Sequence, residues 1–216
     1  MHVDLGTELD DEALRRREEL PDKPDPVVLT GERLVVRAYE PADAAELHSV
    51  TDGTPVERMG RKVGAYDAEE LVWRFIPVGP FADEAAFTAF QESMATRPDG
   101  RTFSVAERDT GRLVGSLSYL ANRPLDLKVE IGAVWYSPAV QGIGVNVEAC
   151  SLLIDHAFAL GYQRVEWKCH AANERSRAAA LRLGFRFEGV QERHTVQKGR
   201  FRDTAWFRVL RPEWPR

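Results

Sequence analysis

Runs of branched aliphatic and aromatic residues, separated by turn residues, predict seven β-strands along the chain. The strands are expected over residues 32–40, 101–109, 112–120, 128–136, 164–170, 185–196 and 200–210. Three of them follow one another directly between residues 101 and 136, which is typical of an antiparallel meander.

Apolar residues at helical spacing predict two long helices. Phe87, Phe90 and Met94 share one face of a helix over residues 82–95. A longer helix ends at a Gly161 C-cap, and its buried stripe is expected at Val147, Cys150, Ile154 and Phe158. Shorter helices are expected over residues 41–50, 67–74 and 174–183.

The order of these elements indicates the fold class. One strand is followed by helices, then by three strands, a helix, a strand, a helix and two strands. This order predicts an α+β protein with a mixed, mostly antiparallel central sheet of about seven strands flanked by helices. We expect a single domain over residues 28–216, because a chain of this length can bury one sizeable core.

Residues 1–27 stand apart from this domain. The segment "ELDDEALRRREEL" predicts a short charged helix, and "PDKPDP" after it predicts an extended linker because proline does not continue a helix. We interpret residues 1–27 as a charged N-terminal extension that packs on the domain or on a partner.

Composition narrows the classes of protein to consider. With 44% hydrophobic residues, including aromatic residues throughout, the chain is expected to fold rather than to be disordered. Two cysteines are too few for a disulfide scaffold, and the histidines form no paired metal-ligand spacing, so no metal is expected. No apolar run is long enough to cross a bilayer, and the acidic N-terminus is unlike a signal peptide. We therefore expect a cytoplasmic protein without a membrane partner.

The net charge of −5 is an average over two unlike halves. Residues 1–100 hold 22 Asp/Glu and 11 Lys/Arg, a net charge of −11, whereas residues 101–216 hold 12 and 18, a net charge of +6. The basic half favours an anionic ligand, and the acidic half favours a cationic partner. A nucleic-acid partner is not expected, because the basic residues form no dense stripe and the whole chain is acidic.

The most informative segment is "QGIGVN", residues 141–146, between the end of a strand and the start of a helix. Gly142 and Gly144 permit a tight turn, and the first N–H groups of the helix are free to bind an anion. The segment is not a P-loop, and Val147 replaces the third glycine of the dinucleotide fingerprint. A pyrophosphate site is the functional interpretation, and a turn that needs glycine only for its geometry is the alternative.

Two ordered motifs make the chain resemble a known family. Gln141, Gly144 and Asn146 follow the pattern Gln/Arg-x-x-Gly-x-Gly/Ala, with Asn146 in place of the usual small residue. A second pattern, Asn-x-x-Ser…Gly-Phe, begins at Asn173 and Ser176. The chain thus resembles the GNAT superfamily of acetyl-CoA-dependent N-acetyltransferases over residues 28–210. The most similar branch is the RimJ/RimL type, which includes ribosomal-protein N-terminal acetyltransferases.

The resemblance implies that acetyl-CoA binds as co-substrate and that no metal takes part. Its pyrophosphate would lie on the N–H groups of the turn, and its pantetheine arm would follow the strand that ends at Tyr136. Asn173 would bond to that arm, unless it serves only as a helix N-cap. The residues assigned to acetyl-CoA are Trp135, Tyr136, Gln141, Gly142, Ile143, Gly144, Val145, Asn146 and Asn173.

Glu130 is the candidate general base that takes the proton of the acceptor amine. It lies 11 residues before Gln141, the spacing found in superfamily members with a base on this strand. By the period of two it shares a strand face with Val134 and Tyr136. Burial would raise its pKa toward a useful value. A solvent-facing glutamate is the alternative.

Ser176 is the second catalytic candidate. Many superfamily members carry, where this chain has Ala180, a tyrosine that protonates the departing thiolate. The RimJ/RimL resemblance implies Ser176 for that role, and a serine that bonds only to the helix backbone is the alternative.

These assignments predict transfer of an acetyl group from CoA to a primary amine, on a protein N-terminus or a small molecule, by direct attack. The alternative is a catalytically weak or inactive acyl-CoA-binding or sensing protein of the same fold, which Ala180 and Asn146 favour. A third hypothesis is an interaction protein organised by residues 1–27. The sequence leaves open the acceptor, the acyl group and the formation of a homodimer.

Overall fold

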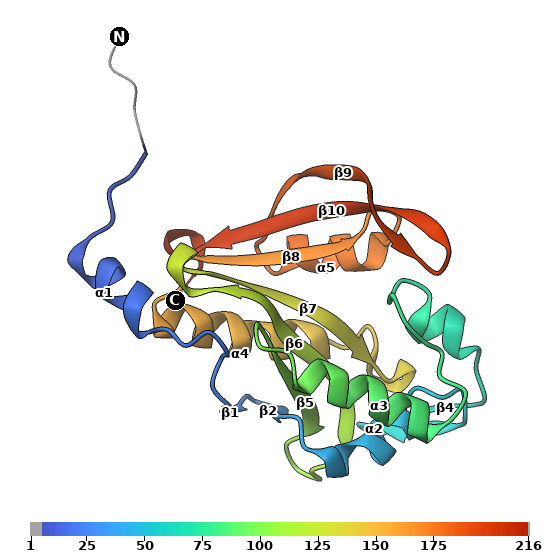
Figure 1. The fold of residues 1–216 in the computed structure, drawn as a ribbon. Helices are drawn as coiled ribbons and strands as arrows, with labels where there is room; N and C mark the ends of the chain where they lie inside the picture. The colour runs from blue at the N-terminus through green and yellow to red at the C-terminus, as the bar shows by residue number, and fades with distance from the viewer. Residues whose placement is uncertain (1–5, 216) are drawn as a thin grey trace.

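The computed structural model describes residues 6–215, which form an eight-stranded sheet with helices on both faces and a separate two-stranded hairpin (Figure 1). The order across the sheet is β1-β2-β5-β6-β7-β8-β10-β9. All neighbours are antiparallel except β7 and β8, which are parallel. The strands of this sheet are β1 (Val28–Thr30), β2 (Leu34–Ala38), β5 (Arg101–Glu107), β6 (Leu113–Arg123), β7 (Lys128–Tyr136), β8 (Arg164–His170), β9 (Arg186–Gln197) and β10 (Arg200–Leu210).

Helices connect and cover these strands. The α-helices are α1 (Asp11–Glu19), α2 (Ala44–Ser49), α3 (Glu84–Ala95), α4 (Val145–Leu160) and α5 (Glu174–Arg182). Short helical turns are η1 (Pro41–Asp43), η2 (Glu69–Trp73), η3 (Pro124–Asp126), η4 (Pro138–Val140) and η5 (Arg211–Glu213). Within residues 6–215, no helix combines the length and the apolar composition needed to cross a bilayer.

All seven predicted strands are present, and the α+β class with a mostly antiparallel sheet is confirmed. The eighth strand is β1, whose three residues pair with β2 at the edge of the sheet and are too few to form a recognisable pattern. The separate hairpin, β3 (Val56–Arg58) and β4 (Arg61–Val63), lies between the predicted helices over residues 41–50 and 67–74, where no strand was predicted. Its turn places Met59 and Gly60 at positive φ, and methionine does not signal a turn of that type.

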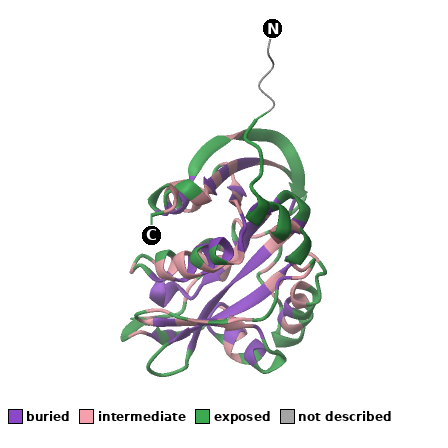
Figure 2. Ribbon diagram, turned by 90° about the vertical axis from the view of Figure 1, so that its left-hand side faces the viewer, coloured by how far each residue is buried: buried purple, intermediate pink, exposed green. Residues whose placement is uncertain are grey.

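The core lies on both faces of the sheet. Alternate residues of β5 point in opposite directions, so that Val105 joins the cluster packed under α4 and Ala106 joins the cluster packed under α2 and α3. Figure 2 shows the buried residues running along the central strands between these helical layers. The predicted buried stripe of α4 is correct at three of its four positions. Val147 is the exception at 38% exposed, because it lies on the side of α4 that borders a cavity.

β7 and β8 separate partway along their length. Their parallel pairing covers Lys128–Ile131 and Arg164–Trp167 and stops there, although both strands continue. On its other side β7 pairs with β6 through a register shift, and Ala133 within this stretch has a φ of 49°. A bulge of this kind bends its strand, and here it lies where β7 leaves β8.

The segment before β1 packs on the domain. Ala13 and Leu20 of the α1 region are buried in the larger core cluster. The Asn122 side chain donates hydrogen bonds to the carbonyls of Pro21 and Asp22, both at 2.9 Å. Residues 11–26 thus run along the end of the sheet as a strap. The division of the chain after residue 27 stays a prediction.

Candidate active site

A cavity of about 1360 Å³, called here the main cavity, opens where β7 and β8 separate. Both strands, the start of α4, α5 and the region of η2 and α3 contribute to its walls. Most of the predicted site residues line it: Glu130, Trp135, Tyr136, Gln141, Gly142, Gly144, Asn146, Asn173 and Ser176. Ile143 and Val145 do not, because their side chains pack toward the core behind the turn. The fold therefore brings together, in one cavity, residues from two sequence motifs.

The charge of the lining is positive. The basic residues are Arg74, Arg97, Lys168, Arg175, Arg182 and Arg202, against three glutamates. This surplus suits a polyanionic ligand. From the acidic first half of the chain only Glu70 contributes a carboxylate, so the excess negative charge of residues 1–100 does not gather at the cavity. The expectation of a cationic acceptor therefore finds no support in the lining.

The turn before α4 presents a row of unpaired donors. The N–H groups of residues 142–147 make no hydrogen bond to any residue between 6 and 215. The first bond of the helix is donated by Glu148 N to the Gly144 carbonyl, at 3.0 Å. Gly142 and Gly144 have φ values of 79° and 88°, and the space beside the Gly142 Cα is open. Six donors at the positive end of a 16-residue helix suit an anion such as pyrophosphate.

Arg33 and Glu148 hold this turn in place. The Glu148 carboxylate accepts hydrogen bonds from the backbone N–H of Arg33 at 2.7 Å and of Leu34 at 3.1 Å. The Arg33 guanidinium donates to Glu148 at 3.0 Å and to the Ile143 carbonyl at 3.0 Å. Arg33 therefore connects the start of β2 both to the turn over residues 141–146 and to the first turn of α4. No sequence motif marks Arg33, and its role follows only from the docking of β2 against α4.

The Gln141 side chain braces the turn from the other side. Its amide nitrogen donates to the carbonyls of Leu71 at 3.0 Å and Tyr136 at 3.2 Å, and its oxygen accepts a hydrogen bond from Arg175. The Gln141 carbonyl in turn accepts a bond from Arg61 of β4, at 3.0 Å. With its side chain engaged by η2, β7 and α5, Gln141 shapes the cavity wall.

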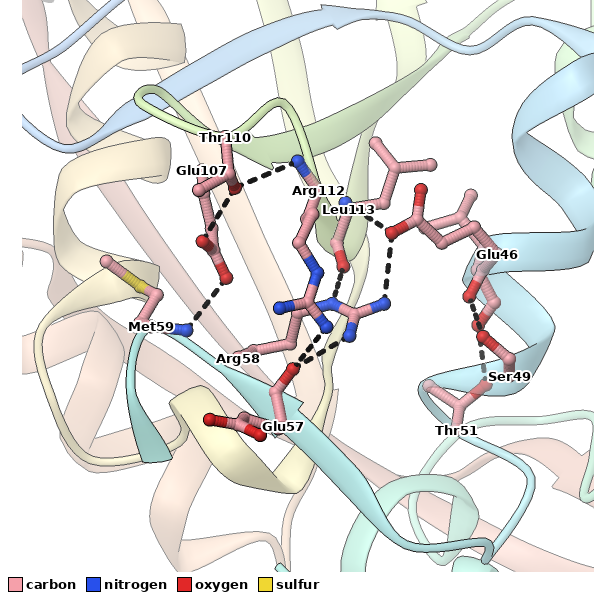
Figure 3. A network of polar contacts seen from close by, with 11 residues as sticks. Glu46, Ser49, Thr51, Glu57, Arg58, Met59, Glu107, Thr110, Arg112 and Leu113 are labelled. Carbon is pink, nitrogen blue, oxygen red and sulfur yellow. Dashed lines mark hydrogen bonds and ion pairs between the residues drawn. The ribbon is translucent and has the colours of Figure 1, made fainter. Parts of the chain in front are cut away.

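The hairpin that carries Arg61 is held by a polar network (Figure 3). Buried Arg58 donates to the Leu113 carbonyl at 2.8 Å and to Glu46 of α2 at 3.0 Å. Glu46 also accepts a bond from the Leu113 N–H, and Glu107 of β5 accepts one from the Met59 N–H at 2.7 Å. The hairpin, α2 and the sheet form one support behind the turn.

Glu130 is buried beside a cation at the point where the strands separate. It is 8% exposed, and its carboxylate lies 2.6 Å from the Lys168 ammonium of β8. Burial raises the pKa of the Glu130 carboxyl, and the Lys168 charge and hydrogen bond oppose that rise. The solvent-facing alternative is therefore wrong. Lys168 itself was not predicted, because a parallel pairing between distant strands leaves no local signal.

The predicted face of Glu130 is also wrong. Val129 and Ile131 point toward the α4 side of the sheet, and so does Tyr136, an even-numbered residue. The bulge at Ala133 shifts the alternation by one residue between Ile131 and Tyr136. Glu130 therefore projects to the opposite face from Tyr136.

Ser176 approaches the same cavity from the α4 side. Trp167 of β8 points into the α4-side core and donates a hydrogen bond from its indole to the Ser176 hydroxyl oxygen, at 3.0 Å. Lys168, the next residue of β8, points the other way and contacts Glu130. Glu130 and Ser176 thus border one opening from opposite faces of the sheet.

Asn173 caps α5, as predicted, by accepting a hydrogen bond from the Ser176 N–H at 3.1 Å. Its side chain also lines the main cavity. Both interpretations of Asn173 are therefore compatible with its position.

Ala180 lies on the buried face of α5, and its methyl side chain supplies no proton donor. Cys150 is likewise a core residue, as predicted, and burial raises the pKa of its thiol. Cys169 lines the main cavity; burial raises the pKa of its thiol, and a hydrogen bond from Ser176 opposes that rise. Trp135 packs with Trp73 in the α2 and α3 cluster, so it borders the cavity as part of its wall.

Among residues 6–215, no group of three or more His, Cys, Asp or Glu side chains is placed to hold a metal ion. One of the five histidines, His2, lies outside the described residues.

Comparison with known proteins identifies the family. Residues 33–186, well over half of the chain, match the acetyltransferase (GNAT) domain. The chain belongs to the GNAT family. The protein is thus an acyltransferase of the N-acetyltransferase type, and GNAT enzymes use acetyl-CoA as co-substrate.

Solved structures of other GNAT proteins have the same fold. A GCN5-related N-acetyltransferase from Brucella melitensis is 32% identical, with a TM-score of 0.79 over 90% of this chain and 83% of the other. A probable acetyltransferase of the GNAT family from Chromobacterium violaceum ATCC 12472 is 30% identical, with a TM-score of 0.83 over 99% and 98% of the two chains.

A curated relative supports the RimJ/RimL resemblance. The ribosomal-protein-serine acetyltransferase of Escherichia coli (strain K12) is 28% identical over 153 residues, which cover 68% of this GNAT chain and 82% of the relative. The resemblance inferred from the two sequence motifs is thereby confirmed.

Proposed function

We propose that this GNAT protein transfers an acetyl group from acetyl-CoA to a primary amine by direct attack, with Glu130 as general base and Ser176 as proton donor to the leaving sulfur. The observation that carries the proposal is the placement of these two side chains on opposite faces of one opening between β7 and β8. This arrangement suits acetyl transfer, because the base can take a proton from the attacking amine on one side of the acetyl carbon while the acid protonates the departing sulfur on the other.

The residues present fit acetyl-CoA. Six unpaired N–H groups at the start of α4 suit its pyrophosphate, and the cationic lining suits its remaining phosphate charge. Beyond Ile131 the edge of β7 toward β8 has no strand partner. N–H groups on such an edge can hydrogen-bond to the pantetheine arm and to the acetyl oxygen.

The roles of the side chains follow from their surroundings. Acetyl-CoA supplies the acetyl group as a thioester and departs as the thiol. As the amine nitrogen bonds to the acetyl carbon, Glu130 accepts the proton that the nitrogen loses. As the carbon–sulfur bond breaks, the Ser176 hydroxyl donates a proton to the sulfur and takes a proton from water in the cavity. The Trp167 indole N–H donates to the Ser176 oxygen and does not engage the hydroxyl proton, which would turn from the Cys169 sulfur to the sulfur of CoA.

The acceptor is proposed as a primary amine on a protein N-terminus or a small molecule. The name of the Escherichia coli relative gives ribosomal-protein serine as its target, which makes a serine N-terminus one acceptor to test. Peptides with an N-terminal serine and small amines therefore form the two arms of an acceptor screen.

Glu130→Gln and Ser176→Ala test the catalytic roles. We expect Glu130→Gln to lower kcat by about 10² to 10⁴-fold, the range of general base catalysis, with the Kd of CoA within about twofold of the wild type. Ser176→Ala should lower kcat by about tenfold or more with a similar Kd. Thiol release and acceptor mass report the turnover, and calorimetry reports CoA binding. Glu192→Gln, on exposed β9, is the matched control.

A binding or sensing protein is the second candidate, because Ala180 supplies no proton donor and Lys168 neutralises Glu130. It predicts CoA binding without thiol release for every acceptor. Wild-type kcat in both variants would contradict the catalytic assignment. The absence of CoA binding by folded protein would overturn both candidates.

A further inference from the structure

A second, smaller cavity of about 360 Å³ adjoins the main cavity and is called here the side cavity. It lies between η2 and the turn that joins β9 to β10. Arg74, Phe75, His170 and Arg202 line both cavities, so the two cavities are neighbours. No residue of the turn before α4 lines the side cavity. It is therefore placed to receive the acceptor rather than CoA.

The side cavity is strongly basic. Its lining contains four cations and one carboxylate: Arg74, Lys198, Arg200, Arg202 and Glu69. Two of the cations are paired, Lys198 with Glu69 and Arg74 with Glu70, each at 2.6 Å. Arg200 and Arg202 have no carboxylate within 4.0 Å in the part of the chain that the structure describes. Two positive charges therefore remain unbalanced at one end of the site.

Arg202 is the more enclosed of the two. Its Nη1 donates to the Gln197 side chain at 3.2 Å, whereas its Nε is buried and has no hydrogen-bond partner between residues 6 and 215. A buried donor without a partner is costly, and a ligand that supplies an acceptor removes that cost. Burial lowers the pKa of Arg202, yet a guanidinium stays charged in proteins. Because it is charged, lines both cavities and has no carboxylate partner between residues 6 and 215, Arg202 is placed to bind an anionic group.

Arg202 also lies near the proposed base. The charges of Glu130 and Arg202 influence each other, and both residues line the main cavity. An acceptor whose amine lies at Glu130 can therefore extend toward Arg202 and the side cavity. Phe75 and His170, whose rings meet edge to face at 5.4 Å, form an aromatic wall along that path.

We propose that the acceptor of this enzyme carries a carboxylate close to its amine, and that Arg202 binds that carboxylate. This inference rests on the proposed acetyl transfer and narrows its acceptor class. Arg200, on the same face of β10 two residues away, adds positive charge at the entrance of the side cavity. The carboxylate can be the one of a free amino acid or the side chain of an acidic residue that follows a peptide N-terminus.

Two matched pairs of acceptors test the proposal and distinguish these sources. The first pair is serine and serinamide. The second is a pentapeptide amide that begins serine-glutamate-aspartate and its counterpart that begins serine-glutamine-asparagine. For the full chain with saturating acetyl-CoA, we expect kcat/KM for the carboxylate member of one pair to exceed that of the neutral member. The pair that shows the preference identifies the source of the carboxylate.

Arg202→Gln should remove the preference. We expect kcat/KM for the carboxylate acceptor to fall by about tenfold to a hundredfold, and that for its neutral counterpart to change by less than about threefold. The ratio of kcat/KM for the carboxylate acceptor to that for its neutral counterpart is compared between the wild type and each variant, so that differences in the intrinsic reactivity of the amines cancel. Arg202→Lys should retain part of the preference, because lysine keeps the positive charge but cannot form a bidentate pair with the carboxylate. Arg15→Gln in exposed α1, at the other end of the molecule (Figure 1), is the control for a change in net charge.

Equal kcat/KM for both members of both wild-type pairs would overturn the inference and leave the proposed acetyl transfer intact. An equal fall for both members in Arg202→Gln would also overturn it. If thiol release is absent with every acceptor, the proposed function fails, and calorimetric titration of the same four compounds into CoA-saturated protein decides the inference alone. CoA affinity and Tm of each variant show whether it is folded.

Discussion

The Glu130 carboxylate is subject to opposing influences from residues on neighbouring strands. Burial raises its pKa, and the nearby Glu166 adds to the rise. Lys168, at 2.6 Å, and the more distant Arg202 act in the opposite direction. The net shift is upward, because desolvation of the charged form outweighs the pairing. A pKa above the ordinary glutamate value of 4.5 makes a better proton acceptor than a free carboxylate.

This balance predicts a particular pH dependence. The active form of a base is deprotonated, so kcat/KM should rise with pH through the pKa of Glu130, at a pH above 4.5. Lys168→Met removes the main opposing charge and should move that limb to higher pH by about one unit or more. Rate profiles against pH for the two proteins give the measurement. An unchanged limb in Lys168→Met would show that Glu130 is not the titrating group.

At this scale the sequence predicted candidate residues of the site but not the side chains that contact them. The motif positions predicted Glu130, Asn173 and Ser176, and all three line the main cavity. Lys168 could not be predicted, since its contact with Glu130 depends on the register of two parallel strands that are far apart in sequence. Arg202 belongs to β10, whose pairing with β8 brings it to the site.

The turn before α4 combines backbone geometry with a side-chain clamp. Gly144 has a φ of 88°, and a Cβ at this position would lie 3.2 Å from the Arg33 guanidinium. That guanidinium holds the Ile143 carbonyl and Glu148. The direction of the unpaired N–H groups therefore depends on Arg33 as well as on the glycines.

Gly144→Ala should weaken CoA binding. The substitution adds about 1 kcal/mol of backbone strain and pushes on the Arg33 clamp, so we expect the Kd of CoA to rise about five- to twentyfold. Gly111→Ala is the matched control, because it has a φ of 72° with nothing near its Cβ and lies in the β5–β6 turn. Calorimetric titration of CoA into both variants measures the two Kd values. An equal Kd in the two variants would contradict the clamp.

Element boundaries with local signals were predicted, and irregular features were not. Asn173 and Gly161 mark the start of α5 and the end of α4 as expected. The bulge at Ala133 was missed, because its positive φ is imposed by pairing with β6 rather than by the alanine itself. The consequence was the wrong face for Glu130.

The strap of residues 11–26 closes the end of the sheet away from the side cavity (Figure 1). Leu20 is 8% exposed, and the carbonyls after it accept hydrogen bonds from Asn122. The Asn122 amide oxygen in turn accepts a bond from buried Tyr162 at 2.6 Å. The strap is therefore part of the core on this side, and we expect it to support stability rather than catalysis.

Leu20→Ala tests this division of roles. Truncation of a buried leucine should lower the free energy of unfolding by about 2–3 kcal/mol, with kcat/KM unchanged. Leu14→Ala, in the same segment but 46% exposed, should cost less than about 0.5 kcal/mol. Urea unfolding and steady-state kinetics provide the two readouts. A loss of activity without a loss of stability would place the strap in the catalytic cycle instead.

At the scale of the whole molecule, the sequence by itself determined the longer helices and strands, the α+β class, the turn before α4 and the GNAT resemblance, because these depend on local spacing and on ordered motifs. The tertiary structure alone decided how the charges are distributed. The acidic residues of the first half lie mostly away from the main cavity, whereas β10 brings Arg200 and Arg202 to its side. Net charge along a chain carries no information on where side chains meet, since strand pairing and register set those contacts. For the same physical reason, the partner of Glu130, the clamp on the turn and the basic side cavity emerge only from the folded protein.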